Sequence, residues 1–274
     1  MKKLLFILLF CINLFGEQRV VTLSPSINEI VYALDKGHLV VANTNFCDFP
    51  ESSKEVKKIG GYSSISIEKI LEVNPSVVIG QNYDEKLISN LKALNITVMD
   101  FKTNTLDNIK NTIQELGTFF NADIKAKELI SNIDKSLASL DNITKDKKIL
   151  FVISPNKSLA NQIYVTGNFL YFEDIIKASG NQNAYNSTNK SQPVVNAEKI
   201  IAMNPDIIIL LGAFFEGKEK ELEEVKNAWR LLPINAAKND NVYAIDKEYS
   251  GIPSHRVQYF IDDFKKILEN VRNK

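Results

Sequence analysis

Two glutamates stand at matching places in a sequence pattern that occurs twice, 130 residues apart. Glu68 begins a Glu-Lys-Ile triplet, and Glu198 begins the same triplet in the second copy. Each triplet is followed at the same distance by an Asn-Pro pair and a β-branched run. A carboxylate in a first helical turn stabilises its helix through the macrodipole. Two matched charges can also dock onto basic sites of a two-fold symmetric partner, and the residues alone leave both explanations open.

A second set of candidate residues is aromatic. Nine aromatic side chains stand in or beside the predicted loops: Phe46, Phe49, Tyr62, Tyr83, Phe169, Tyr171, Phe214, Phe215 and Tyr249. Singly, each is better explained as a residue of the core or its rim. Together they cluster at predicted strand ends, where α/β folds bind their ligands. Aromatic walls with few charges suit a large, flat and partly apolar ligand.

His255 and Arg256 follow the turn at 251–254 and begin the last predicted helix. They could supply a cationic contact or an axial metal ligand, or they could face solvent at the helix start. The only other histidine is His38, so a site in which several imidazoles hold a metal ion is hard to build. The chain also lacks a nucleophile elbow, a Walker loop, a Gly-x-Gly-x-x-Gly motif and a His-Glu-x-x-His motif. We therefore predict a protein that is not an enzyme.

The first sixteen residues are typical of a signal peptide. They comprise a basic start at residues 2–3, an apolar stretch at 4–15 and the small Gly16 at a cleavage position. The apolar stretch is shorter than the ~20 residues that a membrane-spanning helix needs. Cys11 follows a bulky phenylalanine, so a lipid anchor at that cysteine is not expected. We expect an exported, soluble protein.

Composition narrows the class further. Once Cys11 is removed with the signal peptide, Cys47 has no disulfide partner, and we interpret it as a small buried hydrophobe. The chain has 33 acidic residues and, without the two N-terminal lysines, 31 basic ones. This near-neutrality argues against a nucleic-acid partner. No second apolar run approaches ~18 residues, so no membrane-spanning segment is predicted.

The hydrophobic pattern predicts the elements that position these residues. In the first part of the chain, we expect strands at 19–23, 39–42, 76–79 and 97–101, and helices at 27–34, 67–73 and 87–94. In the last part, we expect strands at 149–153, 164–165, 207–211 and 241–245, and helices at 172–178, 218–227 and 256–271. Ser66 and Asn196 are the expected N-caps of the two repeated helices. The alternation of strands and helices is typical of α/β folds.

Residues 106–140 differ, because they carry apolar residues at helical spacing without a convincing strand. Gly117 and residues 121–123 offer a break that would divide this run into two helices, the second capped by Asp123. We interpret the run as a semi-rigid linker. The predicted fold class is α/β, with two Rossmann-like lobes built on central parallel sheets, joined by a long linker helix, and a ligand cleft between the lobes. The predicted bounds are signal peptide 1–16, N-terminal lobe 17–104, helical linker 105–145 and C-terminal lobe 146–274.

Taken together, these sequence patterns resemble those of a known family. It is similar to the periplasmic substrate-binding proteins of ABC importers for cobalamin, iron-siderophores and haem, the class whose two lobes are joined by one long helix. The resemblance spans the chain after the signal peptide. Its marks stand at residues 19–29, 45–50, 61–71 and 74–79 in the first lobe, and at 180–183, 195–201, 204–209 and 253–256 in the second.

The resemblance implies roles for particular residues. Glu68 and Glu198 would engage arginines of the two permease subunits, and a ligand would lie between the lobes with little domain closure. Phe46 and Tyr62 match aromatic wall positions of the cobalamin-binding branch. The other residues that we assign to the ligand site are Pro25, Ser26, Tyr83, Gly167, Asn168, Phe169, Tyr249, His255 and Arg256. No metal is expected to bind the protein directly, although Tyr62 or His255 could be an axial ligand of a bound chelate.

The ligand implied by the resemblance is a metal chelate, and the protein itself needs no cofactor. We rank a cobalamin-like corrinoid first, a ferric siderophore second and haem third. Gln81 and Gln192 stand where the cobalamin branch often has tryptophan, which weakens the expected stacking surface. The expected partners are a permease dimer in the inner membrane and its ATPase, with a monomeric binding protein in the periplasm. The alternatives are an exported chelate-modifying enzyme and a ligand sensor on the same scaffold.

Overall fold

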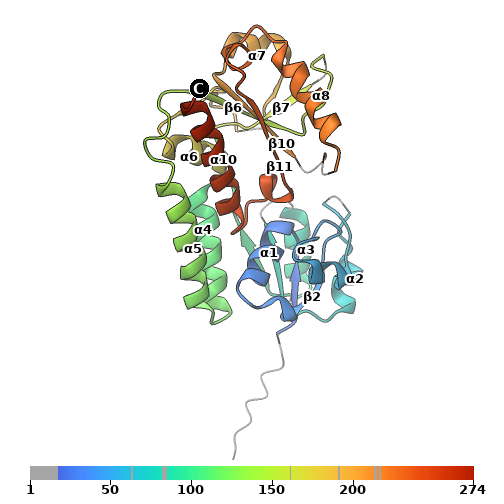
Figure 1. Ribbon diagram of the computed structural model, residues 1–274. Coiled ribbons are helices and arrows are strands. Elements are labelled where there is room, and N and C mark those ends of the chain that lie inside the picture. The colour runs from blue at the N-terminus through green and yellow to red at the C-terminus, as the bar shows by residue number, and fades with distance from the viewer. Residues whose placement is uncertain are drawn as a thin grey trace, which may run out of the picture.

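Two α/β lobes, each built on its own sheet, make up the computed structural model (Figure 1). The structure describes residues 18–62, 64–81, 85–160, 162–190, 192–212, 215 and 217–274. The predicted signal peptide and the two aromatic candidates Tyr83 and Phe214 lie outside these residues. The prediction of an α/β fold with two lobes is confirmed, whereas the residue numbers given for the lobe boundaries stay a prediction.

The sheet of the N-terminal lobe is entirely parallel, with strand order β3-β2-β1-β4-β5. Its central strands are continuous β-branched runs, as expected of strands that are buried on both faces. Helix α1 covers one face, and α2 and α3 cover the other. The elements are β1 (Val20–Thr22), α1 (Pro25–Ala33), β2 (Val40–Asn43), β3 (Lys57–Lys58), α2 (Ile67–Glu72), β4 (Val77–Gln81), α3 (Glu85–Ala93) and β5 (Val98–Phe101).

The sheet of the C-terminal lobe has the order β11-β10-β6-β7-β9, with β8 also paired to β6. Strands β6, β10 and β11 are parallel, but β7 runs antiparallel to both β6 and β9. The expected central parallel sheet is therefore present, with an antiparallel extension at one edge. The elements are β6 (Lys148–Ile153), β7 (Ile163–Val165), α6 (Tyr171–Ala178), β8 (Gln182–Asn183), β9 (Val194–Val195), α7 (Ala197–Met203), β10 (Ile207–Gly212), α8 (Glu219–Arg230), α9 (Asn235–Lys238), β11 (Val242–Asp246) and α10 (Val257–Arg272).

The linker is a pair of helices packed against each other, α4 (Leu106–Phe119) and α5 (Asp123–Ala138) (Figure 1). The chain turns at Asn121, whose φ of 53° is left-handed and ends helical propagation. Gly117 allows the close packing, because a Cβ there would lie 2.4 Å from that of Ala126. Asp123 does not cap α5 as anticipated; its carboxylate instead accepts a hydrogen bond from the Thr118 hydroxyl at 2.7 Å. The predicted helical run and its break are therefore present, but the break makes the linker a pair of packed helices in place of the one long linker helix of the predicted fold.

The duplicated sequence folds as the same local unit in both lobes. Ser66 and Asn196 each accept a hydrogen bond from the backbone N–H three residues later, as N-caps of α2 and α7. Asn74 and Asn204 then adopt nearly identical left-handed conformations, with φ of 43° and 45°. Each is followed by proline and by a strand that pairs with the first strand of its sheet. The repeat predicted from the sequence is confirmed as a helix-turn-strand unit.

One hydrophobic cluster joins the two lobes through the linker helices. It includes Val20 of β1, Ile113 of α4, Ile133 of α5, Phe151 of β6 and Phe264 of α10, all buried. In both sheets the inward side chains belong to this shared cluster. The opposite sheet faces pack against α2 and α3 in one lobe and against α7, α8 and α9 in the other. The helices that carry the repeat therefore form the layer of each lobe that faces away from the shared core.

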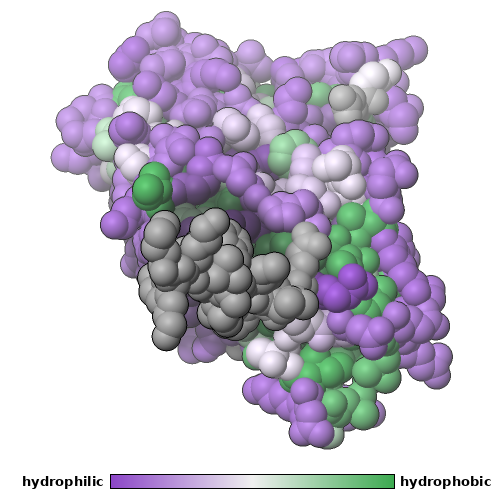
Figure 2. Space-filling model, turned by 90° about the horizontal axis from the view of Figure 1, so that it is seen from below, coloured by the Kyte–Doolittle hydropathy of each residue, from purple (hydrophilic) through white to green (hydrophobic). Residues whose placement is uncertain are grey.

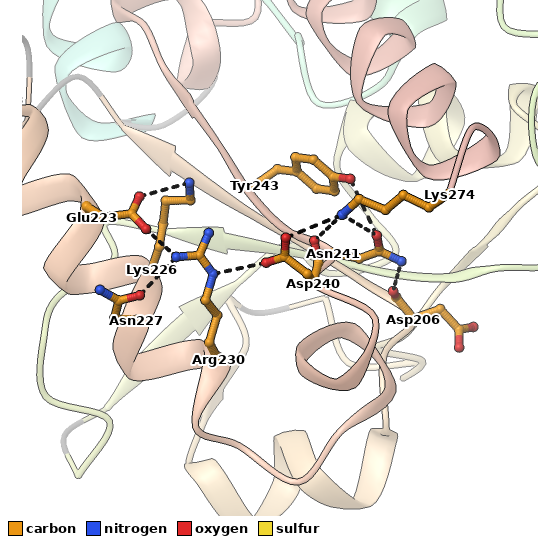
Figure 3. Close-up of polar contacts among 9 residues, drawn as sticks. All are labelled: Asp206, Glu223, Lys226, Asn227, Arg230, Asp240, Asn241, Tyr243 and Lys274. Carbon is orange, nitrogen blue, oxygen red and sulfur yellow. Dashed lines mark hydrogen bonds and ion pairs between the residues drawn. The ribbon is translucent and has the colours of Figure 1, made fainter.

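A polar network fastens the end of the chain to the C-terminal lobe (Figure 3). The Lys274 ammonium donates to the Asn241 side chain at 3.4 Å and lies 3.7 Å from the Asp240 carboxylate. Arg230 of α8 pairs with the other oxygen of Asp240 at 3.2 Å and with Glu223. These contacts hold α8, the turn before β11 and the end of α10 together.

In the view from below in Figure 2, hydrophobic residues gather mainly at the right, and most of the other coloured surface is hydrophilic. In the ranges that the structure describes, no helix combines the length and the apolar composition needed to cross a membrane.

Candidate functional site

A cavity of about 870 Å³ lies between the lobes. Its volume falls within the ~300–1,000 Å³ that is usual for small-molecule sites. The cavity lies at the carboxyl ends of β4, β5, β6 and β10, the edge at which α/β sheets bind ligands. The N-terminal lobe contributes Pro25, Ser26, Tyr62, Gln81 and residues 101–104 to its wall. The C-terminal lobe contributes residues 153–154, 170–172, 211–212, 247–248 and 250–253.

A strip of uncharged polar groups runs along the N-terminal wall. Ser26 stands in the first turn of α1, which Pro25 begins after the N-cap Ser24. The Ser26 hydroxyl donates to the Gln81 carbonyl oxygen at 2.6 Å, and the Gln81 amide donates to the Thr103 hydroxyl at 2.6 Å. These bonds fix the orientation of the amide, because its oxygen and nitrogen each have a defined partner. The strip offers amide and hydroxyl groups to a ligand.

Tyr62 and Phe46 form an aromatic stack at the cavity. Their ring centroids are 5.0 Å apart with an interplanar angle of 22°, and both side chains are about half exposed. Of the two, Tyr62 lines the cavity, while Phe46 stacks against the face of its ring. Partial burial raises the pKa of the Tyr62 phenol above its usual value, so the hydroxyl is neutral at physiological pH. The stack presents a flat apolar surface to a ligand.

The C-terminal wall is also aromatic. Tyr171 and Phe172, at the start of α6, stack with centroids 4.1 Å apart. The Phe172 ring also packs against Phe260 in the core, with the ring centroids 5.2 Å apart. Burial raises the pKa of Tyr171, whose hydroxyl has no hydrogen-bond partner among the described residues. Tyr171 and Phe172 were not assigned to the ligand site from the sequence, although Tyr171 was among the aromatic residues at strand ends.

Arg256 lies in a buried ion pair between the lobes and not on the cavity wall. Its Nε donates to the Glu29 carboxylate at 3.0 Å, and a second nitrogen of the guanidinium pairs with the other carboxylate oxygen. Ser254 donates to the same carboxylate. The guanidinium also lies over the Phe49 ring, 3.7 Å from its centroid. Because Glu29 and Phe49 belong to the N-terminal lobe, Arg256 ties the base of α10 to that lobe.

His255 and Tyr249 flank this ion pair and are not among the residues that line the cavity. The Nδ1 atom of His255 is buried and has no hydrogen-bond partner in the described ranges. Burial, with help from the charges of Arg256 and Lys125, lowers the pKa of His255 to about 4. The Tyr249 hydroxyl donates to Asp263 at 2.6 Å.

The predicted segment 167–169 lies behind the cavity wall, next to the lining residue Leu170. A Cβ on Gly167 would be 3.0 Å from the Pro193 ring, so this position is filled by protein. The Asn168 amide donates to Glu173 at 3.0 Å and accepts a hydrogen bond from the backbone of Ser187. Phe169 lies beneath the Lys190 ammonium, 5.6 Å from the ring centroid. The structure therefore brings Pro25, Ser26 and Tyr62 together at the cavity and places these three residues outside it.

Glu68 and Glu198 lie in the first turns of α2 and α7, on the outer helical layers of the two lobes. Both side chains are exposed, and neither makes an ion pair or a side-chain hydrogen bond with a described residue. Many other surface carboxylates pair with a lysine or an arginine, as Glu72 does with Lys57. The two matched glutamates are thus available to a partner.

Cys47 is buried and hydrogen-bonded to Thr44, and its interpretation as a small buried residue is confirmed. Burial raises the pKa of the Cys47 thiol, which lowers its reactivity. The described residues contain no group of three or more histidine, cysteine, aspartate or glutamate side chains that could hold a metal ion.

The fold and the cavity between two α/β lobes define a bilobal binding protein. The chain belongs to the periplasmic binding protein family, whose model matches residues 20–249. It is similar to the vitamin B12-binding protein of Vibrio parahaemolyticus, with 22% identity over 94% of this chain and 91% of that protein. It is also similar to YvrC of Bacillus subtilis, an uncharacterized ABC transporter substrate-binding lipoprotein, with 27% identity over 84% of this chain and 73% of that protein.

Solved structures share the fold. The periplasmic vitamin B12-binding protein BtuF of Vibrio cholerae matches with a TM-score of 0.76 and 20% identity, over 94% of this chain and 98% of that chain. The periplasmic haem-binding protein HutB of Vibrio cholerae matches with a TM-score of 0.75 and 21% identity, over 92% of this chain and 99% of that chain. The prediction of this family from the sequence is confirmed.

Proposed function

We propose that this chain is the periplasmic binding subunit of an ABC importer that captures a metal chelate and delivers it to a membrane permease. The observation that carries the proposal is the cavity at the strand ends between two lobes that one hydrophobic cluster joins. The relatives with the matching fold bind vitamin B12 or haem, as their names state. We propose no reaction, since the relatives named above are binding or substrate-binding proteins.

A cobalamin-like corrinoid fits the cavity wall best. A corrin is a large, nearly flat ring system with amide groups at its edge, so it needs apolar faces and uncharged polar partners. The Tyr62–Phe46 stack supplies exposed apolar surface on the N-terminal lobe, and Tyr171 and Phe172, which are almost fully buried, lie in the apolar wall of the C-terminal lobe. The Ser26–Gln81–Thr103 strip supplies uncharged donors and acceptors. Gln81 stands where the cobalamin branch often has tryptophan. It therefore offers the ligand an oriented amide group in place of an aromatic ring on which to stack.

Haem and ferric siderophores remain the alternative ligands. Tyr62 favours haem in one respect, because it lines the cavity and a tyrosine oxygen can bind haem iron. His255, the other candidate axial residue, is turned into the joint between the lobes, where its Nδ1 is buried.

Delivery requires a surface that the permease recognises. We propose Glu68 and Glu198 for this role, because both carboxylates are exposed and unpaired in equivalent units of the two lobes. We further propose that the N-terminal sixteen residues direct export and that the protein acts as a monomer.

Absorption spectroscopy tests the choice of ligand. Protein purified from its native host should show the visible absorption bands of a corrinoid. Ligand-free protein should acquire these bands on titration with cyanocobalamin, and its thermal midpoint should rise on binding. Tyr62→Ala should weaken binding about tenfold through the lost aromatic surface. Tyr62→Phe, which keeps the ring, should bind cyanocobalamin like the original protein.

Each outcome separates the candidates. Haemin bands that depend on the Tyr62 hydroxyl, and so disappear in Tyr62→Phe, would replace the corrinoid with haem. Saturable quenching of protein fluorescence by a ferric siderophore alone would replace it with a siderophore. If none of the three chelates shifts the thermal midpoint, the proposed class of ligand is wrong.

A further inference from the structure

Two exposed aliphatic side chains repeat together with the two glutamates. Leu71 follows Glu68 by three positions in α2, and Ile201 follows Glu198 by three positions in α7. Leu71 is 43% exposed and Ile201 is 37% exposed. Residues three apart on a helix are neighbours on one face, so each lobe displays a carboxylate beside an aliphatic side chain. We call each pair a docking patch: Glu68 with Leu71, and Glu198 with Ile201.

Packing against the sheet explains why the positions before these two residues are apolar, but it does not explain why Leu71 and Ile201 are. Ile70 and Ile200, one position earlier, are fully buried against their own sheets. Leu71 and Ile201 belong to none of the hydrophobic clusters that the described residues form. Their exposed area therefore contributes little to folding, although burying it against a partner would be favourable. An exposed aliphatic residue on its own is ordinary; its recurrence in the same phase of both units is what needs an explanation.

The two patches also lie on equivalent layers of the molecule. Helices α2 and α3 cover the face of the N-terminal sheet that points away from the core shared by the lobes. Helices α7 and α8 cover the corresponding face of the C-terminal sheet. The first residue after α3, Leu94, and the first after α8, Leu231, are exposed as well. The apolar surface thus follows the internal symmetry of the chain.

The charges in each patch indicate what the partner must offer. Glu68 and Glu198 have no cationic partner in the described part of the chain, so a basic side chain of another molecule can pair with them. The repeated lysines Lys69 and Lys199 stand one position further along, about 100° around each helix and off the face of the patch. A partner therefore needs a cation next to an apolar pocket, and it needs this arrangement twice.

We infer that the permease recognises both members of each patch, the carboxylate through a basic residue and the aliphatic side chain through an adjoining apolar pocket, once in each subunit of a two-fold symmetric dimer. This inference rests on the proposed function and adds Leu71 and Ile201 to the recognised surface. The apolar contacts supply affinity by burial, and the charges supply orientation and rate of association.

The test measures the affinity of fluorescently labelled protein for its permease–ATPase complex in lipid nanodiscs. The double variant Leu71→Ser/Ile201→Ser should bind the complex about tenfold more weakly, mainly through a faster dissociation rate. Glu68→Gln/Glu198→Gln should lose affinity chiefly through slower association, with a smaller dependence on salt. The conservative variant Leu71→Ile/Ile201→Leu should bind like the original protein, since it keeps the apolar volume.

Ile124, the second residue of α5, provides the matched control. It is 88% exposed and stands outside both patches, so Ile124→Ser should leave the affinity unchanged. Circular dichroism and affinity for the bound chelate should be the same in all variants. Unchanged binding by the Leu71/Ile201 variant, together with loss in the glutamate variant, would overturn the inference and leave the proposed function intact.

Two other results of these experiments would have different meanings. If the original protein does not bind the permease complex at all, the proposed function itself fails. If the original protein forms a dimer in sedimentation experiments that the Leu71/Ile201 variant abolishes, these side chains serve a second copy of the chain and the inference is wrong.

Discussion

Burial between the lobes favours the neutral form of the His255 side chain. Burial lowers its pKa to about 4, and the positive charges of Arg256 and Lys125 act in the same direction. An unfolded chain would restore a pKa of ~6.5. Between these values the unfolded state binds the additional proton, so the folded state loses stability as the pH falls from 6.5 towards 4. Above pH 6.5 the contribution of this residue is constant.

Replacing this histidine should therefore remove a pH dependence. The fall in the free energy of unfolding attributable to His255 over this range is about 3 kcal/mol at most. In His255→Asn it should be absent when urea denaturation is followed at a series of pH values. His38 is exposed and serves as the control, since His38→Asn should keep the pH dependence of the original protein. A profile of His255→Asn that coincides with that of the original protein between pH 4 and 6.5 would refute this account.

At the scale of elements, the left-handed asparagines allow a comparison between the two copies of the repeat. Asn74 and Asn204 both have a left-handed φ, but among the described residues only the Asn204 side chain accepts a hydrogen bond, from the backbone N–H of Asn235 at 2.8 Å. Glycine tolerates positive φ better than any other residue. Asn74→Gly should therefore change the free energy of unfolding by only a few tenths of a kcal/mol, whereas Asn204→Gly should cost about 1 kcal/mol through the lost bond.

Chemical denaturation of the two variants measures this difference directly. Alanine at either position should be less stable than glycine by ~1 kcal/mol, because a Cβ disfavours the left-handed region. Equal losses for Asn74→Gly and Asn204→Gly would show that the bond to Asn235 contributes nothing.

The elements that sequence patterns predicted are those whose cause is local. The helices of the repeat have their capping residues beside them, and the main strands are unbroken β-branched runs, so both were located to within a few residues. The two-residue strands β3, β8 and β9 and the short α9 were not predicted, because they depend on pairing or packing with distant segments. The direction of β7 has the same origin, since antiparallel pairing leaves no signal in a three-residue run.

The same distinction applies to the candidate site. Tyr62, Pro25 and Ser26 line the cavity, as residues at strand ends are expected to do. The polar strip was not predicted, because Ser26 reaches Gln81 across 55 positions of sequence. The partner of Arg256 is 227 positions away in the chain, and neither residue type nor spacing indicated that they meet. Contacts between lobes are set by tertiary packing, which a pattern within one segment does not contain.

For the whole molecule, the Glu29–Arg256 ion pair and the shared hydrophobic cluster fix the two lobes relative to each other. Both charged side chains are almost fully buried, with Ser254 and Phe49 completing their surroundings. Removing one member of such a pair leaves the other charge buried without compensation, which costs ~3–5 kcal/mol. Replacing both members by apolar residues of similar volume is often neutral. The pair therefore contributes more to the fixed position of the lobes than to net stability.

Arg256→Met should accordingly lower the free energy of unfolding by ~3–5 kcal/mol, and the double variant Glu29→Leu/Arg256→Met should recover most of that loss. In the original protein, X-ray scattering with and without ligand should differ little, with backbone shifts of about 1 Å or less, because both lobes and the linker share one core. In the double variant the charge-assisted contacts between α1 and the base of α10 are gone. A larger difference between its ligand-free and ligand-bound scattering would then assign the fixed lobe geometry to the ion pair, whereas identical small differences in both proteins would assign it to the hydrophobic cluster alone.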